Sequence, residues 1–184
     1  LVVHVGGQQR VQHPGRGHRL ARTCGSHQLE GGGGHRPRLG AHRVGVIFGT
    51  STSGVSDAEE ALRHQRQHGG LPPSFAYAQL EFGGGAGFIA DYFGVTGPTY
   101  AISTACSSGA RALATARSLL ELGVCEAVIA GATDTLCNLT IFGFSALQAI
   151  SDEITNPCSA NRKGLSLGEA AAPVSYTHLR AHET

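Results

Sequence analysis

The chain has 184 residues and a formal net charge of +1. Its length allows one domain of ordinary size, and its near-neutral charge excludes a strongly basic nucleic-acid binder or a protein drawn electrostatically to an anionic membrane. No stretch approaches the roughly 20 uninterrupted apolar residues of a membrane-spanning helix, so a soluble globular protein is expected.

The cysteines form an odd set without any Cys-x-x-Cys pair: Cys24, Cys106, Cys125, Cys137 and Cys158. Such a set argues against a disulfide framework and against a zinc site, so we expect a reducing, cytoplasmic setting and no metal ligands. The chain contains no methionine and opens on Leu1 without the charged and then apolar layout of a secretory signal. We therefore expect it to begin inside a longer gene.

Residues 1–43 differ in composition from the rest of the chain. They carry seven arginines, no lysine and a single acid, Glu30, with no periodic apolar pattern. Such composition does not supply a packed core, so this segment is predicted to be a disordered or non-native lead. A metal-binding tract is the alternative, but its histidines follow no ligand spacing: His4, His13, His18, His27, His35 and His42.

Ordered structure is expected from Val44 onward. Residues 44–49 are predicted to form a buried strand that runs into a turn over residues 50–54. Asp57 is predicted to cap a helix that continues to about His68. A second helical stretch is expected over about 75–93, interrupted by the glycines at 83–85.

Residues 100–131 predict a strand, a turn, a helix and a further strand. The strand covers 100–104, and the next one covers 124–130. Between them, apolar residues recur at helical spacing until Gly123 provides a C-terminal stop: Ala110, Leu113, Ala114, Ala116 and Leu120. This order predicts parallel pairing with a right-handed crossover, in an α/β layered fold. Residues 174–184 continue no such pattern and are predicted to be a non-native tail.

Cys106 is the candidate nucleophile, because it falls where the strand gives way to the helix. Unpaired backbone N–H groups and the positive end of the helix dipole would there favour the thiolate. Ser107 and Ser108 are expected to cap the helix, and Gly109 keeps its first turn slim. The same N–H groups would stabilise the oxyanion of a tetrahedral adduct. A buried, structural cysteine is the competing interpretation.

Over roughly residues 44–172 the chain resembles the beta-ketoacyl synthases, the condensing enzymes of the thiolase superfamily. The resemblance is carried by ordered blocks: Gly45 to Gly54, Phe93 to Pro98, Thr104-Ala-Cys-Ser-Ser-Gly109, Ala130 to Asp134, Gly143-Phe144, and Asn156 through Arg162-Lys-Gly164 to Gly168-Glu-Ala-Ala171. It implies a thiolase-like layered αβα(βα) fold, present as an incomplete N-terminal half over 44–173, and a parent that pairs as a homodimer across the strand before the nucleophile.

The resemblance also implies a reaction. Cys106 would take an acyl group from the phosphopantetheine arm of an acyl carrier protein, and the carbanion from malonyl-carrier decarboxylation would then attack the thioester. In the family two histidines promote this second half, but residues 69–175 contain no histidine. We therefore expect the chain on its own to lack turnover.

Two departures from the family pattern concern packing. Cys158 stands where the family usually has phenylalanine, and Ala170 replaces a glycine, which would strain a turn if that position required a positive φ. Glu169 and Arg162 are expected to act as a structural pair, and the remaining cysteines are expected to be core residues.

Two alternatives to a condensing enzyme remain at this stage. One is a non-catalytic scaffold subunit similar to a chain-length factor, against which the retention of Cys106 argues. The other is a dinucleotide-binding domain, because Gly85-Ala-Gly87-Phe-Ile-Ala90 matches G-x-G-x-x-A. No clear strand precedes this motif, and no acid follows about 20 residues later to bind a ribose.

Overall fold

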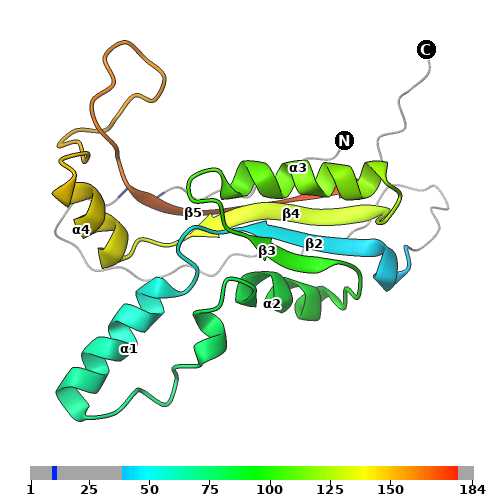
Figure 1. The fold of residues 1–184 in the computed structure, drawn as a ribbon, viewed down its shortest axis with the longest axis horizontal. Coiled ribbons are helices and arrows are strands. Elements are labelled where there is room, and N and C mark those ends of the chain that lie inside the picture. The colour runs from blue at the N-terminus through cyan, green and yellow to red at the C-terminus, as the bar shows by residue number, and fades with distance from the viewer. Residues whose placement is uncertain (1–9, 12–38, 178–184) are drawn as a thin grey trace.

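The computed structural model describes residues 10–11 and 39–177, and its centre is a mixed five-stranded sheet in the order β1-β5-β4-β2-β3 (Figure 1). The strands are β1 (Arg10–Val11), β2 (Val44–Gly49), β3 (Thr99–Ile102), β4 (Ala127–Asp134) and β5 (Gly168–Thr177). β2 pairs in parallel with both β3 and β4, whereas β5 is antiparallel to β4 and to β1. The α/β layered class predicted from the sequence is therefore confirmed.

Helices cover both faces of the sheet. α3 (Ser108–Glu121) lies on one face and α2 (Gly84–Phe93) on the other, while α1 (Val55–His68) and α4 (Asn138–Ala146) lie beyond the carboxyl ends of the strands they follow (Figure 1). Two short 3₁₀ helices, Ala41–Arg43 and Tyr77–Gln79, complete the elements. The carboxyl ends of β2, β3 and β4 therefore meet at one edge of the sheet, where polar side chains can converge.

The central strand β2 divides the core into two layers. Ile47 packs with α3 residues, including Ala112 and Ala116, while Val46 and Phe48 pack with Ala86 and Ala90 of α2. This alternation follows from the two-residue side-chain period of a strand. A strand buried on both faces reads as a continuous apolar run, which is why residues 44–49 could be predicted from their sequence.

The pairing of the strands corrects the sequence-based expectation in one respect. β4 and β3 are both parallel to β2, which lies between them, so the strand–helix–strand unit does not pair its own two strands. β4 also begins at Ala127, three residues later than predicted, and continues to Asp134. The strand order depends on contacts with a segment about 50 residues away, which local patterns do not report.

Two helices begin at places that differ from the predicted ones. α1 begins at Val55 after Gly54, so Asp57 lies in the first turn and is not the cap. The stretch predicted over 75–93 is an α-helix only from Gly84, because a 3₁₀ turn and a loop precede it. Gly94 ends α2 in the left-handed conformation, with φ of 65°, as the sequence predicted.

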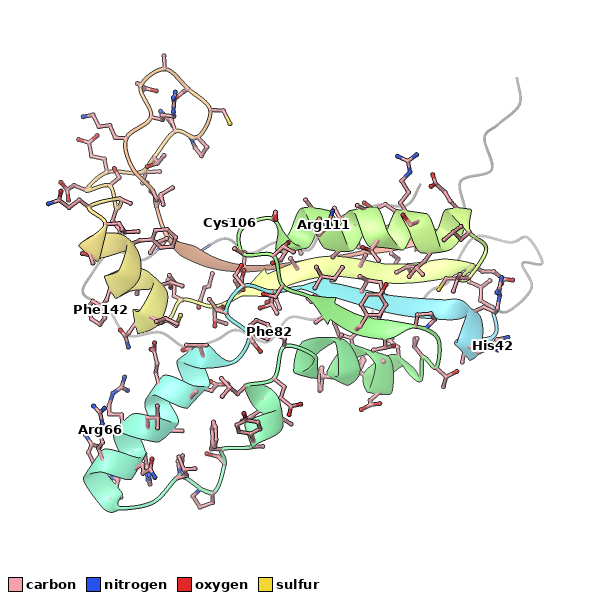
Figure 2. All side chains as sticks on the ribbon, in the orientation of Figure 1. His42, Arg66, Phe82, Cys106, Arg111 and Phe142 are labelled. Carbon is pink, nitrogen blue, oxygen red and sulfur yellow. The ribbon has the colours of Figure 1, made fainter. Side chains whose placement is uncertain are left out.

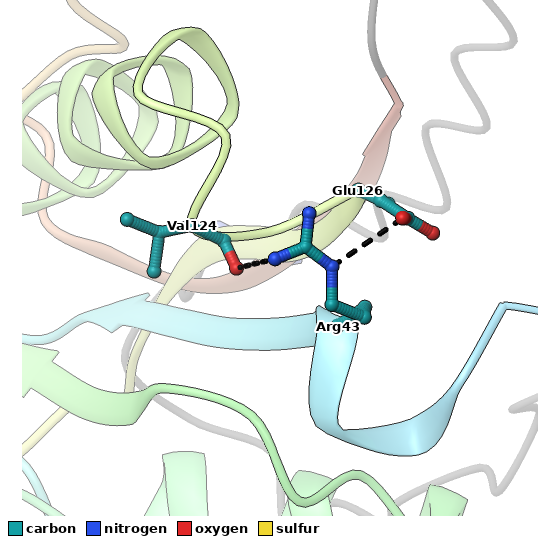
Figure 3. A network of polar contacts seen from close by, with 3 residues as sticks. All are labelled: Arg43, Val124 and Glu126. Carbon is teal, nitrogen blue, oxygen red and sulfur yellow. Dashed lines mark hydrogen bonds and ion pairs between the residues drawn. The ribbon is translucent and has the colours of Figure 1, made fainter.

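The end of the predicted lead is part of the fold. The Arg43 side chain donates to the carbonyl oxygen of Val124 at 3.0 Å and forms an ion pair with Glu126 at 3.3 Å (Figure 3). The Glu126 amide donates in return to the Arg43 carbonyl. The expectation that order starts only at Val44 is therefore wrong for Ala41–Arg43. Arg10–Val11 also pairs with β5; the rest of the predicted lead up to residue 38, with five of the six histidines proposed as a metal tract, lies outside the described residues.

The beginning of the predicted tail is likewise part of the sheet. β5 runs to Thr177, and its register with β4 extends from Ala170 opposite Asp134 to Thr177 opposite Ala127. The expectation that residues 174–177 continue no structure is therefore wrong. Residues 178–184 lie outside the described residues, and the non-native origin assigned to 174–184 stays a prediction, as do the domain boundaries at 43/44 and 173/174.

Gly87 offers a direct test of the α2 assignment. A Cβ atom at this helical position would meet nothing within 4 Å, so Gly87→Ala should raise the free energy of unfolding by about 0.5–1 kcal/mol through lower backbone entropy of the unfolded chain. Urea unfolding measures the change. Gly97→Ala is the matched control, because its Cβ would collide with the Val44 carbonyl oxygen, and it should destabilise. A loss of stability in Gly87→Ala would contradict the helix.

Candidate active site

Cys106 lies in the turn that joins β3 to α3, two residues before the helix begins (Figure 2). Its side chain is exposed, so within the described part of the chain it is not the buried structural cysteine of the competing interpretation. The Arg111 amide donates to the Ser107 carbonyl at 3.0 Å, and no partner for the amides of Gly109 and Ala110 lies among the described residues. The turn therefore places an exposed thiol two residues before a helix whose amides at Gly109 and Ala110 have no partner among the described residues.

The residue before the thiol has an uncommon backbone. Ala105 adopts φ of +51°, a left-handed conformation that costs a residue with a Cβ atom roughly 1 kcal/mol or more. Its carbonyl oxygen accepts from the Ser108 amide at 3.0 Å, from the Ser108 hydroxyl at 2.6 Å and from the Ser51 hydroxyl at 2.9 Å. These three donors hold the strained peptide in place.

The serines after Cys106 do not cap α3 as predicted. Ser107 occupies the N-cap position, but its hydroxyl donates to the Thr104 carbonyl at 2.7 Å and caps no helical amide. The Ser108 hydroxyl accepts from the Thr104 amide at 2.9 Å while it donates to Ala105. Both side chains therefore hydrogen-bond within the turn, and neither caps the first amides of the helix.

A second polar centre lies next to this turn, at the end of β4. The Oδ1 atom of Asp134 accepts four hydrogen bonds from the loop after β2: from Thr50 Oγ1 at 2.9 Å, Ser51 N at 2.7 Å, Thr52 N at 3.0 Å and Thr52 Oγ1 at 3.1 Å. Burial opposes ionisation, yet the amides of Ser51 and Thr52 and the Thr50 hydroxyl outweigh it and hold the pKa of Asp134 below its ordinary value. Asp134 is therefore an ionised anchor for this loop.

The loop held by Asp134 touches the cysteine turn directly. The Ser51 hydroxyl donates to the Ala105 carbonyl, and the Thr50 amide donates to the Ile102 carbonyl at 3.2 Å. The Ser108 hydroxyl oxygen lies 3.4 Å from the Thr50 carbonyl oxygen. Thr50, Thr52 and Ser108 are the buried polar residues of the described part of the chain. They all belong to this one network, so each of these buried polar side chains has a hydrogen-bond partner.

Sequence reasoning quoted Asp134 only as part of a family block and missed it as a site residue. One signal was present: an acid at the end of a buried parallel strand, where carboxyl ends of neighbouring strands meet. Ser51, in the turn after the preceding strand, carried no comparable signal. Its contact with Ala105 joins residues 54 positions apart.

Other charged side chains form hydrogen bonds outside this network. Glu59 of α1 accepts from the amides of Asn138 and Leu139, at 2.9 and 2.7 Å, at the start of α4. Burial opposes the ionisation of Glu59, but these donors outweigh it and lower its pKa. Glu169 accepts from the Leu136 amide at 3.4 Å and Arg162 donates to the Ser159 carbonyl at 3.0 Å. The expectation that they pair with each other is therefore wrong.

The remaining cysteines divide into two kinds. Cys125 and Cys137 are buried, as expected for core residues, whereas Cys158 is exposed, which corrects the prediction for that position. Burial raises the pKa of Cys125. Cys24 lies outside the described residues. Ala170 lies in β5 without a positive φ, so the strain considered there does not arise.

No imidazole contacts the cysteine turn within the described residues. His64 and His68 lie at the end of α1 with ring centroids 4.4 Å apart, and His64 Nδ1 is 2.9 Å from the Gly70 carbonyl oxygen. The chemistry that Cys106 can perform with its described neighbours is therefore nucleophilic attack assisted by backbone amides, without a general base from a histidine side chain.

Two cavities open near the carboxyl edge of the sheet. The larger, about 540 Å³, lies between α1 and α4 and is lined by Arg66 and Phe142 among others. Figure 2 shows both of these side chains at a distance from Cys106. The smaller, about 180 Å³, is lined by Phe48, Phe82 and Asp134. Cys106 lines neither cavity and stands at the surface.

The dinucleotide-binding alternative conflicts with the backbone. The motif glycines Gly85 and Gly87 lie inside α2, and the Gly87 amide donates to the Gly83 carbonyl at 3.0 Å. A phosphate-binding motif of this type requires a glycine-rich turn between a strand and a helix, and here a 3₁₀ turn precedes the helix. This interpretation is therefore wrong.

In the described part of the chain no helix is long and apolar enough to span a bilayer.

Comparisons with known proteins identify the family of the chain. The chain matches the family described as beta-ketoacyl synthase, N-terminal domain, over residues 6–176, and it belongs to that family. The thiolase-like fold expected from the sequence is confirmed by a solved structure, a ketosynthase in complex with its chain length factor from Xenorhabdus doucetiae, to one chain of which this chain is 36% identical with a TM-score of 0.70. That match covers 76% of this chain and 36% of the other.

Among curated relatives, nodulation protein E of Rhizobium meliloti is 30% identical over 77% of this chain and 36% of its own length. The 3-oxoacyl-[acyl-carrier-protein] synthase 2 of Rhizobium meliloti (strain 1021) is 30% identical over 74% of this chain and 34% of its own length. The chain thus spans about a third of the length of these relatives.

Proposed function

We propose that Cys106 is the acyl-accepting nucleophile of a condensing enzyme that acts in fatty acid or polyketide synthesis. The observation that carries this proposal is the exposed thiol at the start of α3, beside amides without a partner in the described residues. Helix N-terminal amides favour an anion, and a thiolate is the reactive form of cysteine. The family membership supports the assignment.

The proposed step is a transthioesterification. The Cys106 thiolate attacks the carbonyl carbon of an acyl thioester carried on the phosphopantetheine arm of an acyl carrier protein, and a C–S bond forms. The resulting oxyanion accepts hydrogen bonds from the free backbone amides at the start of α3. Its collapse breaks the bond to the carrier sulfur, which leaves as a thiolate and takes a proton from solvent. The relative named 3-oxoacyl-[acyl-carrier-protein] synthase 2 supports this carrier as the partner.

We propose that the condensation step itself requires groups outside this chain. Decarboxylation of a malonyl-carrier requires groups that stabilise the carbanion, and the described neighbours of Cys106 include no histidine. Cys106 is also exposed at the surface, so a bound acyl chain would need further walls. The parent protein would supply both in its remaining length, since the chain spans only about a third of its relatives.

We also propose that the parent pairs as a homodimer through β3. β3 is the edge strand next to β2 in the described sheet, and an unpaired edge is a template for strand addition. Exposed aromatic side chains flank it on α2 and on the strand: Phe88, Tyr92, Phe93 and Tyr100. A partner strand would satisfy the edge amides and cover these rings. A reducing compartment, such as the cytoplasm, would keep Cys106 free for the reaction.

Thiol labelling of the whole chain tests the nucleophile. With limiting iodoacetamide at neutral pH, Cys106 should be alkylated about fivefold to tenfold faster than Cys158, because helix-terminal amides stabilise its thiolate. Peptide mass spectrometry gives both rates in one sample. Cys158 is the matched exposed control, and protection of Cys125 and Cys137 verifies folding. Cys106→Ala should abolish acylation by a pantetheine thioester.

Equal rates at Cys106 and Cys158, or acylation that persists in Cys106→Ala, would reject the proposed nucleophile. The scaffold alternative, similar to a chain-length factor, would then gain support, because such a subunit needs the fold but no reactive thiol.

A further inference from the structure

The polar network around Asp134 connects to the cysteine turn through one side chain. Asp134 Oδ1 binds the amide of Ser51 at 2.7 Å, and the hydroxyl of the same serine donates to the Ala105 carbonyl at 2.9 Å. Ala105 is the residue immediately before Cys106. A carboxylate at the end of β4 is thus joined to the backbone of the nucleophile turn through a single intervening residue.

The geometry of Ala105 explains why such a connection matters. Its φ of +51° is unfavourable for a residue with a Cβ atom, so the turn keeps this conformation only where surrounding contacts hold it. Two of the three donors to the Ala105 carbonyl come from Ser108, within the same turn. The Ser51 hydroxyl is the donor that comes from a different part of the fold.

The loop that carries Ser51 is held by several hydrogen bonds. Asp134 holds its amides and hydroxyls from Thr50 to Thr52 with four hydrogen bonds to one oxygen, and the Thr50 amide is tied to Ile102 at the end of β3. Thr50 and Thr52 are buried. The ionised state of Asp134 strengthens each of these bonds, since charge-assisted hydrogen bonds are roughly twice as strong as neutral ones.

We infer that Asp134 and Ser51 are positioning residues for Cys106: Asp134 fixes the loop after β2, and Ser51 fixes the left-handed Ala105 peptide so that the thiol stays at the start of α3. Without the Ser51 hydroxyl, Ala105 relaxes towards a negative φ and turns Cys106 away from the helix amides. This inference rests on the proposed function of Cys106, which it deepens by naming the residues that hold the nucleophile in its reactive place.

The test measures the rate of iodoacetamide alkylation at Cys106 relative to Cys158 in the same molecules of the whole chain. Ser51→Ala should lower this ratio about threefold to tenfold, which corresponds to the loss of one hydrogen bond. Asp134→Asn should lower it as well, because a neutral amide holds the loop less firmly. Ser51→Thr keeps the hydroxyl and should stay within about twofold of the parent.

Ser53→Ala is the matched control in the same loop, since its hydroxyl donates to the Glu81 carbonyl at 2.9 Å and not to Ala105. It should leave the ratio unchanged. Loss of folding is detected separately, because it would expose Cys125 and Cys137 to the reagent. A positioning role lowers the Cys106 ratio while these two thiols stay protected, and the threonine variant restores it.

Two results would overturn the inference, and they differ. If the parent labels Cys106 faster than Cys158 and folded Ser51→Ala keeps that ratio, the positioning role fails while the proposed nucleophile stands. If the parent shows no selectivity for Cys106, the proposed function fails, and the positioning role fails with it.

Discussion

Asp134→Ala is expected to lower the free energy of unfolding by about 2–4 kcal/mol at neutral pH. The substitution removes an acceptor shared by four donors, and hydrogen bonds to a charged group contribute roughly 1.5–3 kcal/mol each, without strict additivity. Thr50 and Thr52 are buried, so their donors lose a partner that water replaces poorly. Urea unfolding followed by circular dichroism measures the loss.

The same variant carries a pH signature. The pKa of Asp134 is lower in the folded chain than its ordinary value of 3.8, so its contribution is fully present above that value and is lost as pH falls through the lowered pKa. The difference in stability between parent and Asp134→Ala should therefore be constant from neutral pH down to about pH 5 and shrink below about pH 4. A difference that grows on acidification would contradict the assignment.

Asp57→Ala serves as the matched control for this experiment. Asp57 is an exposed acid in the first turn of α1, where its interaction with the helix dipole is worth about 0.3–1 kcal/mol. A loss in Asp134→Ala no larger than this would show that the loop after β2 does not depend on the carboxylate.

Gly49→Ala is expected to lower stability by about 1–3 kcal/mol and also to slow the labelling of Cys106. A Cβ atom at this end of β2 would lie 2.5 Å from the Ser108 carbonyl carbon and 2.8 Å from the Gly109 amide nitrogen. These are backbone atoms, which cannot rotate away as a side chain can, so the start of α3 must shift. Overpacking of this kind costs typically 1–3 kcal/mol.

Urea unfolding and the Cys106 to Cys158 labelling ratio together measure this prediction. Gly70→Ala is the control, because a Cβ at Gly70 meets nothing within 4 Å and both values should stay near those of the parent. An unchanged midpoint and ratio in Gly49→Ala would mean that β2 and α3 do not pack closely at the turn.

Local sequence patterns predicted the elements whose signals lie within a few residues of each other. The apolar run at 44–49 and the helical spacing that ends at Gly123 reappear as β2 and α3. The boundaries were less well predicted, because a side chain expected to cap a helix can hydrogen-bond elsewhere in the turn. Ser107 shows this: a good N-cap residue donates instead to the Thr104 carbonyl, since the turn fold offers a nearer acceptor.

The expectation for residues 174–177 failed for a related reason. β5 contains alanines and Pro173, which are depleted in strands, and its β-branched and aromatic residues, Val174, Tyr176 and Thr177, come only at its end. It forms because β4 presents an edge to which it pairs in antiparallel register over eight residue pairs. Strand pairing between distant segments is stabilised by partners that a local window does not contain.

The sequence by itself determined the class of the fold, the family resemblance and the position of Cys106 at a strand-to-helix turn, because each rests on patterns that are visible within short segments of the chain. Only the tertiary structure decided that β2 separates β3 from β4, and that Asp134 and Ser51 converge on the peptide before the thiol. The physical reason is the same in both cases. Parallel strands bring their carboxyl ends together whatever their separation in sequence, and the hydrogen bonds formed there join residues more than 50 positions apart.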